Sequence, residues 1–303
     1  MVSNTPLAWP VKLRDNTIYV LDETLLPIEE KYIVVNSLDT ALKVLVQMKT
    51  RAFGQVLLFF YTCAILGDID KVTQSFRSAR PTFDFLLLSN ILKKVCSKIK
   101  NIKEAVNFLL EDFEEKRIKR TKKIAQILPD FSKILTICNV SGELVYLYNS
   151  LREIGKDAFF YVSETRPYLQ GSRLTMWEFK KANIPAKLIY DSQAAIIMEN
   201  KLINCIITGS DRSTKNGDII NKIGTYPLAV LAKHYGIPFY ALVQYPSEID
   251  IDNINIEERP EKEVFMWVND NNLPNNLDSF YPAFDITPSR FITKRFDLAG
   301  NLN

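Results

Sequence analysis

The sequence predicts an α/β protein in two parts: a small, mainly helical N-terminal domain over residues 1–125 and a parallel-sheet domain over residues 126–303. The length of 303 residues suits two domains of roughly 100–200 residues each. The spacing of apolar residues changes near residue 125, from a helical period to short β-rich runs separated by helices. Hydrophobic residues make up 47% and charged residues 24%, which is typical of globular proteins.

The N-terminal domain opens with a predicted β-hairpin. Residues 11–22 (VKLRDNTIYVLD) form two short runs around Asp15-Asn16, a pair that favours a tight turn. From about Ser37 to Ile127, apolar residues recur at helical spacing, and Pro81 interrupts the pattern. The longest apolar run, residues 56–66, falls short of the ~20 residues of a membrane helix and predicts a buried core helix.

Charge argues against nucleic acid as the main partner. The chain has 38 basic and 35 acidic residues, a net charge of +3. Residues 116–123 hold six basic residues in eight, but acidic residues directly precede them. We therefore interpret this stretch as a solvated helix face rather than a nucleic-acid patch.

The C-terminal domain alternates strands with helices. Five β-rich runs occupy residues 133–138, 157–164, 186–191, 205–211 and 238–244. Helical segments of about 10–15 residues between strands indicate βαβ units and a parallel sheet. The Asn/Asp-rich residues 268–278 predict an exposed loop.

Several kinds of chemistry lack support in the sequence. The four cysteines are far apart and form no CxxC pair, so zinc sites and disulfide frameworks are poor interpretations. The one histidine, His234, falls at the end of a predicted helix, a position that suits a cation. No Walker A or GxGxxG pattern is present. Residues 1–16 lack a signal-peptide layout, so we expect a cytoplasmic protein with no membrane association.

Polar and small side chains follow four consecutive predicted strands. Because ligands bind beyond the carboxyl ends of parallel strands, these residues are the candidates for a site. Arg166, Arg173 and Lys222 suit a phosphate, and Gln170 and Asn221 suit sugar hydroxyls. The edge therefore predicts a site for a phosphorylated sugar.

Two residues of that edge are suited to catalysis. Asp211 is a candidate acid or base if burial raises its pKa, with helix capping as the alternative. Cys138 is placed where a helix is expected to begin, which favours a thiolate, with a buried small side chain as the alternative.

Three strings resemble the methylthioribose-1-phosphate isomerase family. They are ETRPYLQGSRLT, GSDRSTKNGDIINKIGTYPLAVLAKHYGIPFYAL and IEERPEKEV. The family also includes ribose-1,5-bisphosphate isomerases and the regulatory subunits of initiation factor 2B. The resemblance is strongest from Ile134 to Val264 and continues through Tyr281–Thr287. It implies a Rossmann-like C-terminal domain and a small helical N-terminal domain.

The resemblance also implies roles for single residues. The family's catalytic cysteine and catalytic acid correspond to Cys138, in CNVSG, and Asp211, in GSDR. Its substrate-binding residues correspond to Arg51 and Arg80, which bind phosphate, and to Gln170, Asn221 and Lys222. It implies conversion of 5-methylthioribose 1-phosphate to 5-methylthioribulose 1-phosphate in methionine salvage. It further implies a homodimer that needs no cofactor and no metal.

One loop departs from the family. Its usual RGAPAIG is Arg51-Ala52-Phe53-Gly54-Gln55-Val56-Leu57 here, so an alanine replaces a glycine and a bulky Phe53 follows. We expect this change to reshape the wall beside the phosphate. Two alternatives therefore stay open: an isomerase of another sugar 1-phosphate, such as ribose 1,5-bisphosphate, and a non-catalytic regulatory protein like the initiation factor 2B subunits.

Overall fold

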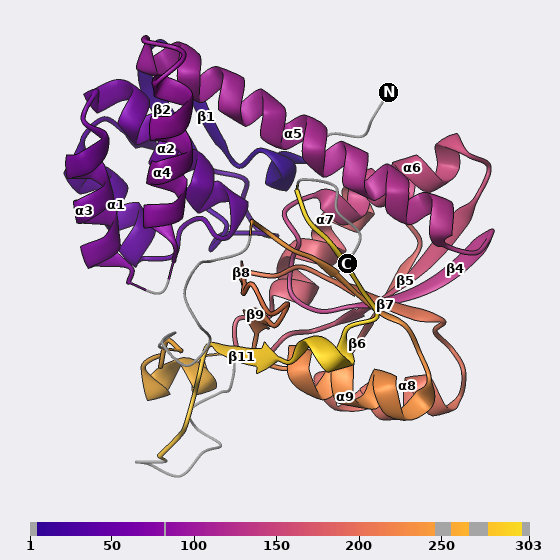
Figure 1. Ribbon diagram of the computed structural model, residues 1–303. Helices are drawn as coiled ribbons and strands as arrows, with labels where there is room; N and C mark the ends of the chain where they lie inside the picture. The colour runs from indigo at the N-terminus through magenta and orange to yellow at the C-terminus, as the bar shows by residue number, and fades with distance from the viewer. Residues whose placement is uncertain (1–4, 82, 246–255, 267–277, 299–303) are drawn as a thin grey trace. The chain divides into compact units, whose positions relative to one another are not determined.

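The computed structural model describes residues 5–81, 83–245, 256–266 and 278–298, and its secondary structure is drawn in Figure 1. The chain forms two compact units. One unit comprises the described residues up to Ile127 together with Val140–Glu153 and Leu298. The other comprises Leu128–Asn139 and the described residues from Ile154 to Asp297.

The N-terminal unit begins with a three-stranded antiparallel sheet. Its strands are β1 (Val11–Arg14), β2 (Thr17–Leu21) and β3 (Tyr32–Val35), in the order β1-β2-β3. Asp15 and Asn16 have φ of 48° and 61°, the left-handed pair of a tight hairpin turn, and Arg14 pairs with Thr17. The predicted hairpin is confirmed, and β3 adds a strand that the sequence did not indicate.

Six helices complete this unit. They are α1 (Leu38–Val46), α2 (Phe53–Leu66), α3 (Ile69–Ala79), α4 (Phe85–Cys96), α5 (Ile102–Ile127) and α6 (Glu143–Glu153). Three begin with a side chain that accepts a backbone N–H three residues on: Ser37, Asp68 and Asp84. Helix α2 is apolar all round and buried, as predicted, and its Phe59 ring lies 5.5 Å from the rings of Phe76 and Phe85.

The basic stretch of α5 is not a solvated face throughout. Arg117 and Arg120 are only 2% and 1% exposed, and both contact Glu143 of α6. The Arg120 Nε donates to Glu143 Oε2 at 2.5 Å. Burial alone raises the pKa of the Glu143 carboxyl, but the two guanidiniums outweigh it and hold the pKa below its usual range. The prediction is wrong for these two residues, because a buried carboxylate from another helix compensates their charge.

The second unit is built on a parallel sheet, as predicted. Its order is β12-β10-β7-β4-β5-β6, and every neighbouring pair is parallel. The strands are β4 (Phe131–Thr136), β5 (Asp157–Ser163), β6 (Ala186–Ile189), β7 (Cys205–Thr208), β10 (Phe239–Leu242) and β12 (Lys294–Phe296). The five predicted runs supply five of these strands. The sixth, β12, was not predicted, because three residues with two cations give no strand pattern.

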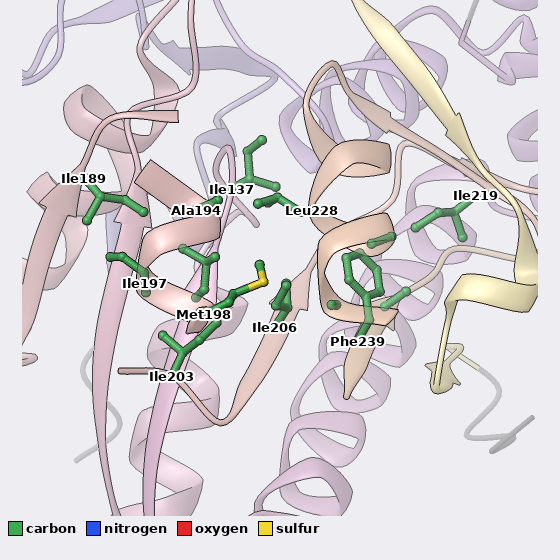
Figure 2. Close-up of a cluster of buried hydrophobic side chains, with 14 of the residues drawn as sticks. Ile137, Ile189, Ala194, Ile197, Met198, Ile203, Ile206, Ile219, Leu228 and Phe239 are labelled. Carbon is green, nitrogen blue, oxygen red and sulfur yellow. The ribbon is translucent and has the colours of Figure 1, made fainter. Parts of the chain in front are cut away.

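Three α-helices lie in the described part of this unit. They are α7 (Met176–Lys181), α8 (Ala194–Glu199) and α9 (Thr225–Tyr235). Figure 2 shows Ile197 of α8 and Leu228 of α9 in one cluster with Ile206 of β7 and Phe239 of β10. This cluster fixes the strands whose ends carry the candidate site residues. In the described ranges, the structure has no helix with the length and apolarity that crossing a membrane requires.

A small antiparallel sheet was not predicted. It joins β8 (Arg212–Ser213), β9 (Ile219–Lys222) and β11 (Phe284–Thr287) in the order β11-β9-β8. Strand β9 is buried along its whole length and carries Asn221 and Lys222 opposite Asp285 and Phe284. Apart from Asp278, the predicted loop at residues 268–278 lies outside the described residues.

Candidate active site

Two of the predicted site residues follow the central strands of the parallel sheet. The chain runs from β4 toward β5 and β6 on one side, while β7, β10 and β12 lie on the other. The strand order therefore reverses between β4 and β7, and such switch points are where open α/β sheets bind ligands. Cys138 comes two residues after β4, and Asp211 comes three residues after β7.

Cys138 is half-buried and has a left-handed backbone, with φ of 65°. Its N–H donates to Thr165 Oγ1 at 2.9 Å, and its carbonyl accepts from Thr175 Oγ1 at 2.6 Å. The next side chain, Asn139, donates to Glu178 Oε2 at 2.5 Å. These bonds hold the cysteine in a conformation that costs a non-glycine residue free energy. Helix α6 begins at Glu143, so Cys138 precedes the helix by five residues and is not part of its first turn.

The loop after β5 is held tightly and carries Gln170. Asp191 accepts the backbone N–H groups of Thr165 and Arg166 at 2.8 and 2.7 Å, and the hydroxyl of Ser163 as well. Gln170 is only 2% exposed, and its Oε1 has no hydrogen-bond partner in the described ranges. A buried amide oxygen without a partner is rare in proteins, so this atom is suited to a ligand hydroxyl.

Asn221 and Lys222 are both buried, although both are polar. The Asn221 amide donates to Thr208 Oγ1 at 3.0 Å and to Thr225 Oγ1 at 2.9 Å. The Lys222 Nζ lies 4.7 Å from the centre of the Phe284 ring and 5.8 Å from that of Tyr168. Aromatic faces attract a cation, so these rings help to keep a charged amine in a buried position.

Asp211 lies between strands. Its N–H donates to the carbonyl of Ile220 at 2.9 Å, and β8 starts at the next residue, Arg212. The alternative that Asp211 caps a helix is therefore wrong, because the residues after it form a strand. Its side chain is half-buried.

Arg51 and Arg80 belong to the N-terminal unit. The Arg51 N–H donates to Glu23 Oε1 at 3.0 Å. Arg80 ends α3, and its Nη1 lies 3.0 Å from the sulfur of Met48, three residues before Arg51. Arg80, one of the two predicted phosphate-binding arginines, thus contacts the loop that carries the other, Arg51. Burial, the largest influence, raises the pKa of Glu23 to about 7, against the opposing effect of Arg51.

The altered loop has a strained backbone. Ala52 has φ of 42° and ψ of −115°, a region that suits glycine and not a residue with a Cβ. The following Phe53 packs its ring 5.5 Å from Trp9 and 4.1 Å from the Arg117 guanidinium. The bulk of Phe53 is thus accommodated among side chains of the N-terminal unit.

Three residues near the predicted set were missed. The rings of Tyr168 and Tyr281 are tilted at 50° to each other, with their centres 6.4 Å apart. Asp285 accepts the N–H groups of Gly224 and Tyr226 at 2.8 and 3.0 Å and so caps α9, and burial raises its pKa to about 6. All three lie in or beside the strings that carry the family resemblance, which was the available signal. Within the described residues, no group of three or more His, Cys, Asp or Glu side chains is arranged to hold a metal ion.

The fold and this edge define a class of protein: an open α/β protein with a polar site beyond its switch point. Comparison with known proteins shows which family within this class the chain belongs to. The chain belongs to the initiation factor 2 subunit family, whose model matches residues 40–302.

The relatives include enzymes of one name. The chain is 34% identical to the methylthioribose-1-phosphate isomerase of Carboxydothermus hydrogenoformans, over 92% of this chain and 91% of that protein. It is 35% identical to the enzyme of the same name from Petrotoga mobilis, over 92% and 90%.

Solved structures of two kinds share the fold. The 5-methylthioribose 1-phosphate isomerase of Pyrococcus horikoshii superposes with a TM-score of 0.80 at 27% identity, over 99% of this chain and 95% of that one. The delta subunit of translation initiation factor eIF-2B from A. fulgidus gives 0.78 at 28% identity, over 96% and 94%. The fold alone therefore does not separate the enzyme from the initiation factor subunit.

Proposed function

We propose that this chain is an aldose–ketose isomerase that converts 5-methylthioribose 1-phosphate to 5-methylthioribulose 1-phosphate, a step of methionine salvage. The reaction is an intramolecular oxidation–reduction, since C2 is oxidised and C1 is reduced. The observation that carries the proposal is the position of Cys138 and Asp211 beyond the two strands at the switch point. The names of the relatives at 34–35% identity support the same reaction.

The substrate sets a particular chemical problem. Its 1-phosphate blocks the anomeric oxygen, so the ring does not open by losing a proton from a free hydroxyl. We assign Asp211 as the acid that protonates the ring oxygen, O4, as the bond between C1 and O4 breaks and the ring opens. A hydrogen then moves from C2 to C1 and the O2 proton leaves, which gives the C2 ketone. Cys138 either takes the C2 proton or assists a direct hydride shift, and both routes end in the same product.

The remaining residues bind the substrate in this proposal. Arg51 and Arg80 bind the phosphate; Arg80 contacts Met48, which lies three residues before Arg51. Asn221, Lys222 and Gln170 bind sugar oxygens, and the buried Oε1 of Gln170 accepts from a hydroxyl. The enzyme works in the cytoplasm as a homodimer, without metal or cofactor.

The test is turnover of 5-methylthioribose 1-phosphate, followed by NMR of the ketose product. Cys138→Ser and Asp211→Asn are each expected to lose most of the turnover while staying folded. Cys96→Ser and Asp70→Asn are matched controls in the N-terminal unit and should keep it. If either Cys138→Ser or Asp211→Asn keeps full turnover, the role assigned to that residue is wrong.

Two other functions have a specific observation behind them. The strained Ala52, next to Arg51, favours a different sugar phosphate, so ribose 1,5-bisphosphate belongs in the same assay. The TM-score of 0.78 to an initiation factor subunit favours a regulatory protein. Co-elution with initiation factor subunits in size-exclusion chromatography, with no turnover of either sugar, would support that function.

A further inference from the structure

The hydroxyl of Tyr281 is a buried donor that nothing in the described part of the chain accepts. Tyr281 is 5% exposed and lies three residues before β11. Its carbonyl accepts the N–H of Arg259 at 3.0 Å, which fixes the backbone. Its hydroxyl oxygen is fully buried and has no hydrogen-bond partner among the described residues. A buried hydroxyl in this state calls for an explanation, because burial without a partner costs free energy.

The neighbouring tyrosine is the opposite case. The Tyr168 hydroxyl accepts from Arg259 Nη2 at 3.0 Å and is also hydrogen-bonded to Glu263. Arg259 in turn binds Glu257 at 2.7 Å and Glu263 at 2.7 Å and 2.9 Å. This ionic network is satisfied without Tyr281, although the centres of the two tyrosine rings are only 6.4 Å apart. Of these two tyrosines, Tyr281 is therefore the one whose hydroxyl has no partner among the described residues.

The surroundings of the hydroxyl belong to the proposed site. Tyr281 interacts electrostatically with Cys138, with Tyr168 and with the pair formed by Glu263 and Arg259. Burial, followed by Tyr168 and Glu263, raises the pKa of Tyr281 well above its usual value against the opposing effect of Arg259, so the phenol keeps its proton and remains a donor. The centre of the Tyr168 ring, next to Tyr281, also lies 5.8 Å from the amine of Lys222.

We propose that the Tyr281 hydroxyl donates a hydrogen bond to the ligand oxygen on C2, the oxygen that becomes the ketose carbonyl. This inference rests on the proposed function, in which Cys138 acts at the same carbon. A bound sugar would then supply the partner that the protein lacks. The bond also favours the product side of the reaction, because a carbonyl oxygen accepts but does not donate.

The test compares Tyr281→Phe with Tyr168→Phe, since each removes a single oxygen and keeps the ring. Tyr281→Phe is expected to melt at the same temperature as the parent protein or higher, because no protein partner is lost. Its kcat/KM for 5-methylthioribose 1-phosphate should fall by about tenfold, the effect of one lost hydrogen bond to the ligand. Tyr168→Phe should melt at a lower temperature, because it loses bonds to Arg259 and Glu263.

Three results would overturn the inference. If the parent protein is active and Tyr281→Phe has an unchanged kcat/KM, the proposed hydrogen bond to the ligand does not exist, while the proposed function still holds. A lower melting temperature in Tyr281→Phe means that the hydroxyl binds within the protein. If the parent protein is folded but does not turn over 5-methylthioribose 1-phosphate, both the proposed function and this inference are wrong.

Discussion

Glu23→Gln is expected to stabilise the protein at pH 8 and leave it unchanged at pH 4.5. In the folded protein Glu23 is buried and has a pKa of about 7, against an ordinary value of 4.5. Its Oε1 accepts both the Thr50 hydroxyl, at 2.6 Å, and the Arg51 N–H, at 3.0 Å. A glutamine offers the same acceptor and mimics the protonated acid, so the native contacts survive the substitution.

The size and sign of the effect follow from the difference between the two pKa values. Below pH 4.5 the carboxyl of Glu23 is protonated in both states, and between 4.5 and 7 only the unfolded state has lost the proton. The free energy of unfolding therefore falls as the pH rises through this window. At 1.36 kcal/mol for each of about 2.5 pKa units, the loss reaches about 3 kcal/mol above pH 7.

Urea unfolding of both proteins at pH 4.5, 6, 7 and 8 measures the effect. The difference between the two free energies of unfolding isolates Glu23, because the other titrating groups are common to both. Glu29→Gln, the same change at an exposed position, serves as the control. A difference that stays constant across this pH range would refute the reasoning.

Three further substitutions test particular contacts by their free energy of unfolding. Ala52→Gly should stabilise the protein by about 1 kcal/mol, because glycine adopts φ of 42° and ψ of −115° without strain; a loss of stability would contradict this. Arg120→Met should cost about 3–5 kcal/mol, since it takes one of two guanidiniums from the buried Glu143, whereas Lys122→Met on the exposed side should have little effect. Gly171→Ala should cost about 1–3 kcal/mol, because a Cβ there would lie 1.7 Å from the carbonyl oxygen of Ser163; an unchanged midpoint would mean that the loop yields.

The centre of the parallel sheet was predictable because strand β7 is buried on both faces. Buried parallel strands read as nearly continuous apolar runs, and CIIT of β7 is such a run. The smaller sheet had no such signal: β8 has two residues, and β9 contains the polar pair Asn221 and Lys222. Its strands exist because β11, more than sixty residues on, pairs with β9, and local sequence carries no trace of that pairing.

Side-chain environments were harder to predict than elements. Cys138, Gln170 and Asp211 were found because they follow β4, β5 and β7, whose ends share one edge of the parallel sheet, whereas Lys222 lies in β9 of the smaller sheet. The burial of Arg117 was not predictable, because its compensating carboxylate comes from a different helix. Likewise, the sequence shows a tyrosine at position 281, but only the fold shows that its hydroxyl is enclosed without a partner.

The chain passes between its two compact units more than once, and this limits how it can be divided. After β4 it leaves the second unit at Asn139, contributes α6 to the first unit, and returns at Ile154. A fragment that stops at Ile127 would lack Glu143, so Arg117 and Arg120 would lose the carboxylate that compensates their charges. Cys138 lies two residues before Val140, where the chain re-enters the first unit. Exchange of whole units between relatives would therefore require four joins within the described residues, one of them directly after the loop that carries the cysteine proposed to act on the sugar.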